Sequence, residues 1–309
     1  MNEAAYRQAE QRYWTSVGLA PAERILHLDL LNTDIRVQEV GEGPVVVFVH
    51  GGSASGANWA PLVAHVDGFR CVMIDRPGCG LSPAIDRDLT ELARFLEAAD
   101  ALVVDVLDAL GESKAPIVAT SLGAMYAVRA AAAHPDRVDR LVEFGFTLGA
   151  GLTHVPLSMR IATLPGLGRL MMSMPPTKGA VRAIMRQLGH GPALKDGRIT
   201  PEMLAWFLAL LRHTPSMRNE ANVPKEAIKL GMAGQVLLPN DVLARVVCPV
   251  RHIWGDADPM GGVEVAESFV AHFADVELEM WPNSGHAPWI DDPELAANRV
   301  VDFLTCGRR

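Results

Sequence analysis

Cysteine is scarce in this chain. Only four cysteines occur in 309 residues, and no two of them stand in a C-x-x-C arrangement. Such spacing predicts neither a disulfide framework nor a zinc site built from paired cysteines. We therefore expect no structural role for sulfur or metal in this fold.

Concentrated positive charge is also missing. The chain has 28 lysines and arginines against 36 aspartates and glutamates, which gives a formal net charge of -8. Because binding to phosphate backbones needs clustered basic side chains, nucleic acid is not a predicted partner.

Long apolar runs are absent as well. The longest, MLAWFLALL at 203–211, is far shorter than the roughly 20 residues that span a bilayer. The first residues, MNEAAYRQAEQRYW, are polar and lack the apolar centre of a signal peptide. We expect a cytoplasmic protein without a membrane span.

What the chain does contain is an alternation of apolar strands and amphipathic helices. Strands are predicted over 45–50, 70–75, 115–120 and 138–144, with a long helix over 89–110. Continuous apolar runs are typical of strands covered on both faces. The pattern predicts an α/β fold with a mostly parallel, doubly wound sheet, preceded by a short helix and an antiparallel hairpin.

This alternation stops at residue 147 and returns at 248. The intervening segment has helical stretches but no convincing strand, and it is rich in methionine. We predict a core of residues 1–146 and 241–309 that carries an inserted helical cap, 147–240. Flexible methionine side chains adapt to irregular apolar ligands, so this cap is expected to cover an apolar pocket and exclude water.

Polar residues follow the predicted strands at their carboxyl ends. Ser121 directly follows the strand at 115–120, whereas Asp258 and His286 follow the last two predicted strands, at 248–255 and 276–281. A glycine-rich loop, 50–53, follows the first buried strand. Because sites in open parallel sheets form at these ends, the three side chains are expected to meet there. A hydroxyl, an imidazole and a carboxylate are the parts of a serine nucleophile activated by a base.

Several segments together resemble the α/β-hydrolase family of the Ser-His-Asp type. They are VHGGS (49–53), DRPGCGLS (75–82), ATSLGA (119–124), HPDRVDRLV (134–142), WGDADPM (254–260) and SGHAPWIDDPE (284–294). The order Ser, Asp, His along the chain is the order of this family. One departure is Ala119, where the family's G-x-S-x-G turn usually has glycine; a small residue is expected to be tolerated there.

The resemblance implies the catalytic roles. Ser121 would be the nucleophile, His286 the base and Asp258 the acid, with Asp256 and Glu143 as alternative acids. The backbone N–H groups of Gly52 and Leu122 would form the oxyanion hole, and Ser53 is the neighbour that could replace Gly52. His50 is expected to support the glycine-rich loop, and His190 is expected at the surface or in ordinary packing.

The resemblance also implies a hydrolase that needs no metal or organic cofactor. We predict cleavage of a carboxylic ester or lactone of a fairly apolar small molecule through an acyl-enzyme. Candidate pocket residues are Ser53, Met125, Phe146 and Trp289, although core packing is an equal possibility for the last three.

Two other functions stay open. One is hydrolysis of a C–C bond in a ring-cleavage product, but relatives of that type usually have asparagine where this chain has Thr120, and an aromatic residue where it has Ala287. The other is a receptor that keeps the pocket and binds a ligand without rapid turnover.

Overall fold

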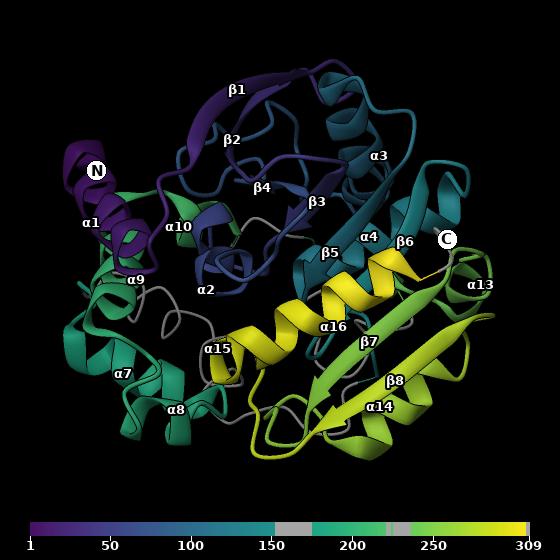
Figure 1. Cartoon of the computed structure of the whole chain (residues 1–309). Helices are drawn as coiled ribbons and strands as arrows, with labels where there is room; N and C mark the ends of the chain where they lie inside the picture. The colour runs from purple at the N-terminus through teal and green to yellow at the C-terminus, as the bar shows by residue number, and fades with distance from the viewer. Residues whose placement is uncertain (152–174, 221–223, 225–235, 307–309) are drawn as a thin grey trace.

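A mostly parallel sheet organises the computed structural model, which describes residues 1–151, 175–220, 224 and 236–306. Its eight strands lie in the order β1-β2-β4-β3-β5-β6-β7-β8 (Figure 1). The pairs β1–β2 and β2–β4 are antiparallel, and the other pairs of this sheet are parallel. The strands are β1 Ala22–Leu28, β2 Thr33–Val40, β3 Val45–Val49, β4 Arg70–Ile74, β5 Ala115–Thr120, β6 Val138–Phe144, β7 Val250–Gly255 and β8 Val276–Trp281.

Helices cover both faces of this sheet, as the continuous apolar strands predict. Along β3, Val47 and Val49 belong to one hydrophobic cluster, while Val46 and Phe48 belong to the other. Figure 1 shows α16 in front of the sheet and α3 behind it. The helices of the core are α1 Glu3–Ser16, α2 Ala60–Val63, α3 Leu92–Leu110, α4 Leu122–Ala133, α14 Val263–Val270, α15 Pro288–Asp291 and α16 Pro293–Thr305, with a 3₁₀ turn η1 at Gly56–Trp59.

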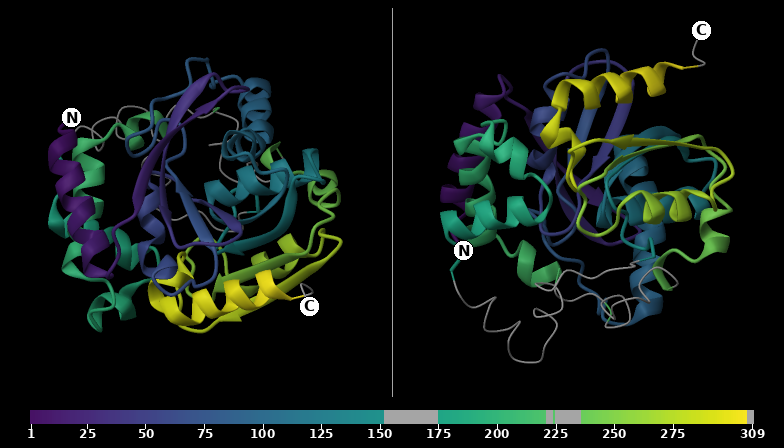
Figure 2. Two further views of the ribbon diagram at one scale, coloured as in Figure 1. Left: turned by 45° about the horizontal axis from the view of Figure 1, so that its top comes forward. Right: turned by 90° about the horizontal axis from the view of Figure 1, so that it is seen from below.

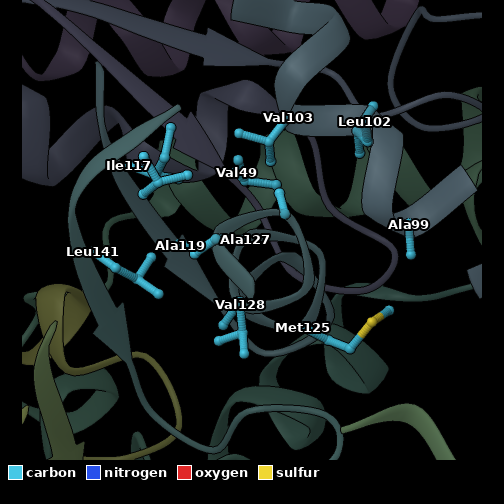
Figure 3. Packing of buried hydrophobic residues seen from close by; sticks show 14 of the residues in the cluster. Val49, Ala99, Leu102, Val103, Ile117, Ala119, Met125, Ala127, Val128 and Leu141 are labelled. Atoms are coloured by element: carbon cyan, nitrogen blue, oxygen red, sulfur yellow. The ribbon is translucent and has the colours of Figure 1, made fainter. Parts of the chain in front are cut away.

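The cluster behind the sheet is formed by β3, β5, α3 and α4. Figure 3 shows Val49 and Ala119 from the strands near Val103 and Val128 from the helices. All four side chains are buried. This packing fixes the direction in which α4 leaves the carboxyl end of β5. The predicted α/β fold is therefore confirmed.

The segment 147–240, which we call the insertion, lies between β6 and β7. Its described helices are α7 Lys178–Gln187, α8 Gly191–Lys195, α9 Pro201–His213, α10 Ser216–Glu220 and the start of α13 Asn240–Leu243. Residues 152–174, 221–223 and 225–235 of the predicted cap lie outside the described residues, and they include five of its methionines: Met159, Met171, Met172, Met174 and Met232.

Helix α1 packs against the insertion. It lies beside α9 in both views of Figure 2, and the rings of Tyr13 and Trp206 stack with centroids 5.1 Å apart. Both side chains are buried. The N-terminal helix thus supports the insertion helix α9. Within the described ranges, no helix combines the length and apolar character needed to cross a membrane.

Candidate active site

Ser121 occupies the sharp turn between β5 and α4. Its backbone has φ 54° and ψ −120°, a conformation that L-residues rarely adopt. A Cβ atom at Gly123 would lie 2.3 Å from the carbonyl oxygen of Val49, so this position requires glycine. Ala119, by contrast, is buried in the core cluster, which accommodates its methyl group. The turn therefore closes despite the alanine in the motif.

Asp258 and His286 form a hydrogen-bonded pair. The Nδ1 atom of His286 lies 2.8 Å from Oδ2 of Asp258. The backbone N–H of Phe146 donates to the same oxygen at 2.9 Å, and that of Met260 donates to Oδ1 at 3.0 Å. Asp258 is thus a buried carboxylate with both oxygens hydrogen-bonded, and it fixes the orientation of the imidazole.

The environment of Asp258 favours its ionised form. Burial by itself raises the pKa of this carboxyl. The charge and hydrogen bond of His286, with the N–H groups of Met260 and Phe146, outweigh burial and hold the pKa below its ordinary value. Because the Asp258 carboxylate accepts a hydrogen bond from Nδ1 of His286, the proton of the neutral imidazole lies on Nδ1. Its Nε2 can therefore accept a proton from another group.

The two alternative acids have different surroundings. Asp256 is exposed, although it lies in the same loop as Asp258. Glu143 is completely buried in β6, where its Oε2 accepts a 2.6 Å hydrogen bond from the Thr147 hydroxyl. Burial raises the pKa of Glu143 to about 8. Among the described contacts of His286, only Asp258 supplies a carboxylate.

The glycine-rich loop is held by Arg76. Its guanidinium donates to the carbonyl oxygens of His50 at 2.9 Å and Gly51 at 2.8 Å, while its backbone N–H donates to Nε2 of His50 at 3.1 Å. Burial, followed by the charge of Arg76, keeps the pKa of His50 well below its ordinary value. His50 therefore supports the loop as a neutral residue.

One of the two candidate oxyanion donors in this loop is already used. The N–H of Ser53 donates to Oε2 of Glu220, at the end of α10, with a distance of 3.1 Å. The other oxygen of Glu220 accepts from Arg76 at 2.6 Å. Leu122 begins α4, so its N–H has no acceptor within the helix. Gly52 and Leu122 thus remain the better candidates for an oxyanion hole.

Ser121 and His286 line one cavity of about 320 Å³. Gly52 also lines it, together with Ser53 and Trp289, which are two of the candidate pocket residues. Most of its remaining walls are apolar, and several come from the insertion. These further lining residues include Met185, Leu188, Trp206, Phe207, Met260 and Ile290.

Met125 and Phe146 do not line this cavity among its described walls. Met125 is buried behind the sheet, close to Val128 in Figure 3. Phe146 packs edge-to-face on Trp254 with ring centroids 5.9 Å apart. Both side chains therefore lie in core packing, which is one of the two possibilities that the sequence left open for them. A separate cavity of about 310 Å³, bordered by Tyr126, has no member of the Ser-His-Asp set in its described lining.

His190 is the site residue that the sequence did not reveal. It is completely buried and lines the cavity, where a surface or packing role was expected. Its Nδ1 lies 2.9 Å from Oδ2 of Asp291, and its Nε2 accepts from the N–H of Ala287 at 3.2 Å. The described residues contain no group of three or more His, Cys, Asp or Glu side chains that could hold a metal ion.

Comparisons with known proteins agree with this geometry. Residues 46–299 match the sequence model described as the alpha/beta hydrolase family. The chain is 28% identical over 288 residues to a 2-hydroxy-6-oxo-6-phenylhexa-2,4-dienoate hydrolase of Burkholderia cepacia, covering 90% of this chain and 93% of that protein. It is also 28% identical over 277 residues to a pimeloyl-[acyl-carrier protein] methyl ester esterase of Nitrosospira multiformis, covering 86% and 97%.

A similar arrangement of the backbone occurs in a solved structure. The crystal structure of carboxylesterase CesB from Bacillus subtilis superposes with a TM-score of 0.78 at 18% identity. The match covers 99% of this chain and 98% of the other. At this identity the likeness concerns the fold.

Proposed function

Because this chain belongs to the alpha/beta hydrolase family, we propose that it is a serine hydrolase that cleaves a carboxylic ester or lactone through an acyl-enzyme. One observation carries the proposal. Ser121, in its strained turn, opens onto the same cavity as His286, whose ring is oriented by buried Asp258. The relatives include ester hydrolases and C–C hydrolases, which supports hydrolysis as the reaction class.

The proposed first step forms the acyl-enzyme. The hydroxyl oxygen of Ser121 attacks the substrate carbonyl while Nε2 of His286 takes its proton. Asp258 stabilises the imidazolium, and the N–H groups of Gly52 and Leu122 bind the oxyanion. Each such donor contributes about 3 kcal/mol to lowering the barrier. The C–O bond then breaks, and the alcohol leaves with the proton from His286.

The second step releases the acid. His286 takes a proton from water, whose oxygen attacks the acyl carbon; collapse of the intermediate returns the proton to Ser121. In a lactone the alcohol stays attached, so a hydroxy acid is released. All the groups required come from the chain itself.

The cavity supports a fairly apolar substrate of modest size. Met185, Trp206 and Phe207 from the insertion face it together with Trp289 from the core. We propose that the insertion, 147–240, is a cap on the core formed by 1–146 and 241–309. Such a cap excludes water from the intermediate and shapes the acyl pocket.

A C–C hydrolase is the second candidate, because a relative that matches 90% of the chain is named a 2-hydroxy-6-oxo-6-phenylhexa-2,4-dienoate hydrolase. The residues next to the catalytic ones favour the ester or lactone. Thr120 lines the cavity, but its hydroxyl donates to the carbonyl oxygen of Phe144 at 2.8 Å, so it has no proton left to donate to a substrate as an asparagine amide would. Ala287 also lines the cavity and offers no aromatic face.

A substrate panel tests the reaction. It comprises 4-nitrophenyl esters of short and long acids, small and macrocyclic lactones, and 2-hydroxy-6-oxo-6-phenylhexa-2,4-dienoate. We expect ester or lactone hydrolysis that disappears in Ser121→Ala. Hydrolysis by Ser121→Ala at the wild-type rate would refute the mechanism. Faster turnover of the dienoate than of every ester and lactone would establish the second candidate instead, and tight binding without turnover would indicate a receptor.

Three substitutions assign the acid. Asp258→Asn is expected to lower kcat by about four orders of magnitude, because the imidazole loses its orienting charge. Asp256→Asn and Glu143→Gln are expected to keep kcat near the wild-type value. A loss in either of these that matches the loss in Asp258→Asn would reassign the acid.

A further inference from the structure

Three consecutive backbone N–H groups fix the loop that carries His286. Gly285 donates to Oδ2 of Asp291 at 2.8 Å, and His286 donates to the carbonyl oxygen of Leu188 at 2.8 Å. Ala287 donates to Nε2 of His190 at 3.2 Å. Two of the three acceptors therefore belong to one turn of the insertion, between α7 and α8.

His190 can accept this bond only as one neutral tautomer. Its Nδ1 lies 2.9 Å from the carboxylate of Asp291, to which it donates, so the proton sits on Nδ1 and leaves the lone pair of Nε2 for Ala287. His190 is 0% exposed and Asp291 is 3% exposed. Asp291 thus does for His190 what Asp258 does for His286, since each carboxylate selects the tautomer of its histidine.

The turn is also wedged between the two catalytic loops. Gly189 has φ 87°, and a Cβ atom there would lie 2.4 Å from the carbonyl oxygen of Ala257, beside Asp258. A Cβ atom on Gly285 would lie 2.4 Å from the carbonyl oxygen of Leu188. Backbone contacts this close leave the turn little freedom to shift without moving the acid or the base.

We propose that the turn Leu188–His190 positions the catalytic base, and that His190 is a positioning residue which acts through the N–H of Ala287. This inference rests on the proposed serine hydrolase. Displacements of about 1 Å in a catalytic group can cost about 100-fold in rate, so the hydrogen bond from Ala287 has kinetic consequences. Leu188 and His190 also line the cavity, so the turn that would hold the base forms part of the cavity wall.

Two substitutions separate the acceptor role from simple packing. The side-chain oxygen of glutamine can reach the place of Nε2, so His190→Gln keeps an acceptor for Ala287. The amide nitrogen of the shorter asparagine side chain can take the place of Nδ1. His190→Asn therefore keeps the hydrogen bond to Asp291 and loses the acceptor for the N–H of Ala287. His272→Asn, at an exposed position of the core, is the matched control.

The variants are assayed with 4-nitrophenyl butyrate, together with Ser121 labelling by a fluorophosphonate and hydrogen exchange of the peptide that contains 285–287. We expect His190→Asn to lower kcat and the labelling rate by about 10- to 100-fold with little change in KM. His190→Gln should stay within about fivefold of wild type. Exchange at 285–287 should become faster in His190→Asn only.

Other results overturn the inference. Wild-type kcat and exchange in His190→Asn would show that the acceptor is dispensable. Equal losses in both variants, with equally lowered Tm, would show that His190 only fills space. Failure of the proposed function would appear differently, as labelling or hydrolysis that does not depend on Ser121. In that case the exchange of 285–287 still decides whether His190 holds the loop.

Discussion

Replacing Glu143 by glutamine should make the fold less sensitive to rising pH. Glu143 is buried in β6, and its only described hydrogen bond is the one from Thr147. Nδ1 of His252 lies 3.9 Å away, but burial lowers the pKa of this histidine to about 4, so it is uncharged at neutral pH. No cation among the described contacts therefore compensates an ionised Glu143.

The size of the effect follows from the pKa. The ordinary value for glutamate is 4.5, whereas burial raises the pKa of Glu143 to about 8. Between these values the unfolded chain gives up a proton that the folded chain keeps, so stability falls as pH rises. Each pH unit costs about 1.4 kcal/mol. From pH 6.5 to pH 8 the loss due to Glu143 is about 2 kcal/mol.

His252 has the opposite dependence, but at lower pH. Burial lowers the pKa of His252 in the folded state, so the free energy of unfolding decreases as pH falls below 6.5. Above pH 6.5 the difference between Glu143→Gln and wild type thus isolates the carboxyl. The amide has nearly the shape of the protonated acid and can still accept from Thr147.

Urea denaturation at pH 6.5, 7.25 and 8 measures this difference. We expect the free energy of unfolding of Glu143→Gln to gain about 2 kcal/mol relative to wild type across the window. Glu264→Gln, at an exposed position of α14, is the control and should run parallel to wild type. Parallel curves for Glu143→Gln and wild type would refute the buried, protonated state of Glu143.

Three further predictions concern other parts of the site. Gly123→Ala places a methyl group 2.3 Å from the carbonyl oxygen of Val49, so we expect a lower Tm and loss of fluorophosphonate labelling; unchanged labelling would contradict the tight turn. Because the pKa of Asp258 is lowered in the folded state, its ionised carboxylate stabilises the fold above pH 3.8, and this stabilisation is lost as pH falls through the pKa of the folded state. Urea denaturation should therefore show that Asp258→Asn is less stable than wild type at pH 7 and that this difference shrinks below pH 3.8. A difference that stays constant with pH would contradict the lowered pKa. Trp206→Ala widens the cavity, and kcat/KM across an acyl-chain series should move toward longer chains; an unchanged preference would remove Trp206 from the acyl pocket.

The fold was predictable because each local signal agreed with the sheet. Continuous apolar strands such as VVVFV are buried on both faces in the structure, and a run of this kind has few other stable places. Boundaries were less certain. The helix predicted over 89–110 begins at Leu92 and ends where Gly111 takes φ 75°. Residues 89–91 form a turn before this helix, and apolar periodicity alone does not distinguish such a turn from helix.

The candidate catalytic side chains could be proposed from their places at strand ends, whereas Asp258 was preferred over Asp256 and Glu143 only by the family resemblance. Asp256 and Asp258 share a loop and a residue type. Asp258 is buried and accepts hydrogen bonds from the N–H groups of Phe146 and Met260, whereas Asp256 is exposed. Phe146 is distant from Asp258 in the chain and Met260 is near it. For Met125 the sequence left pocket and core open, and the side chain lies in the core cluster.

His190 shows why a sequence pattern can indicate candidate catalytic residues without indicating which residues hold them. Its two partners are Ala287 and Asp291, which lie 97 and 101 positions away in the chain. No periodic or short-range signal connects residues at such separations. Glu220 presents the same difficulty, since it binds Ser53 across 167 positions.

These two contacts change how the insertion is understood. From the sequence it is a cover that shapes an apolar pocket, and a cover by itself alters substrate binding. In the structure, Glu220 holds the loop of the proposed oxyanion hole and His190 holds the loop of the proposed base. Groups placed in this way act on the transition state as well as on binding, because they set the positions of the reacting atoms. The proposed roles therefore predict that substitutions in α7 to α10 change substrate preference and turnover together.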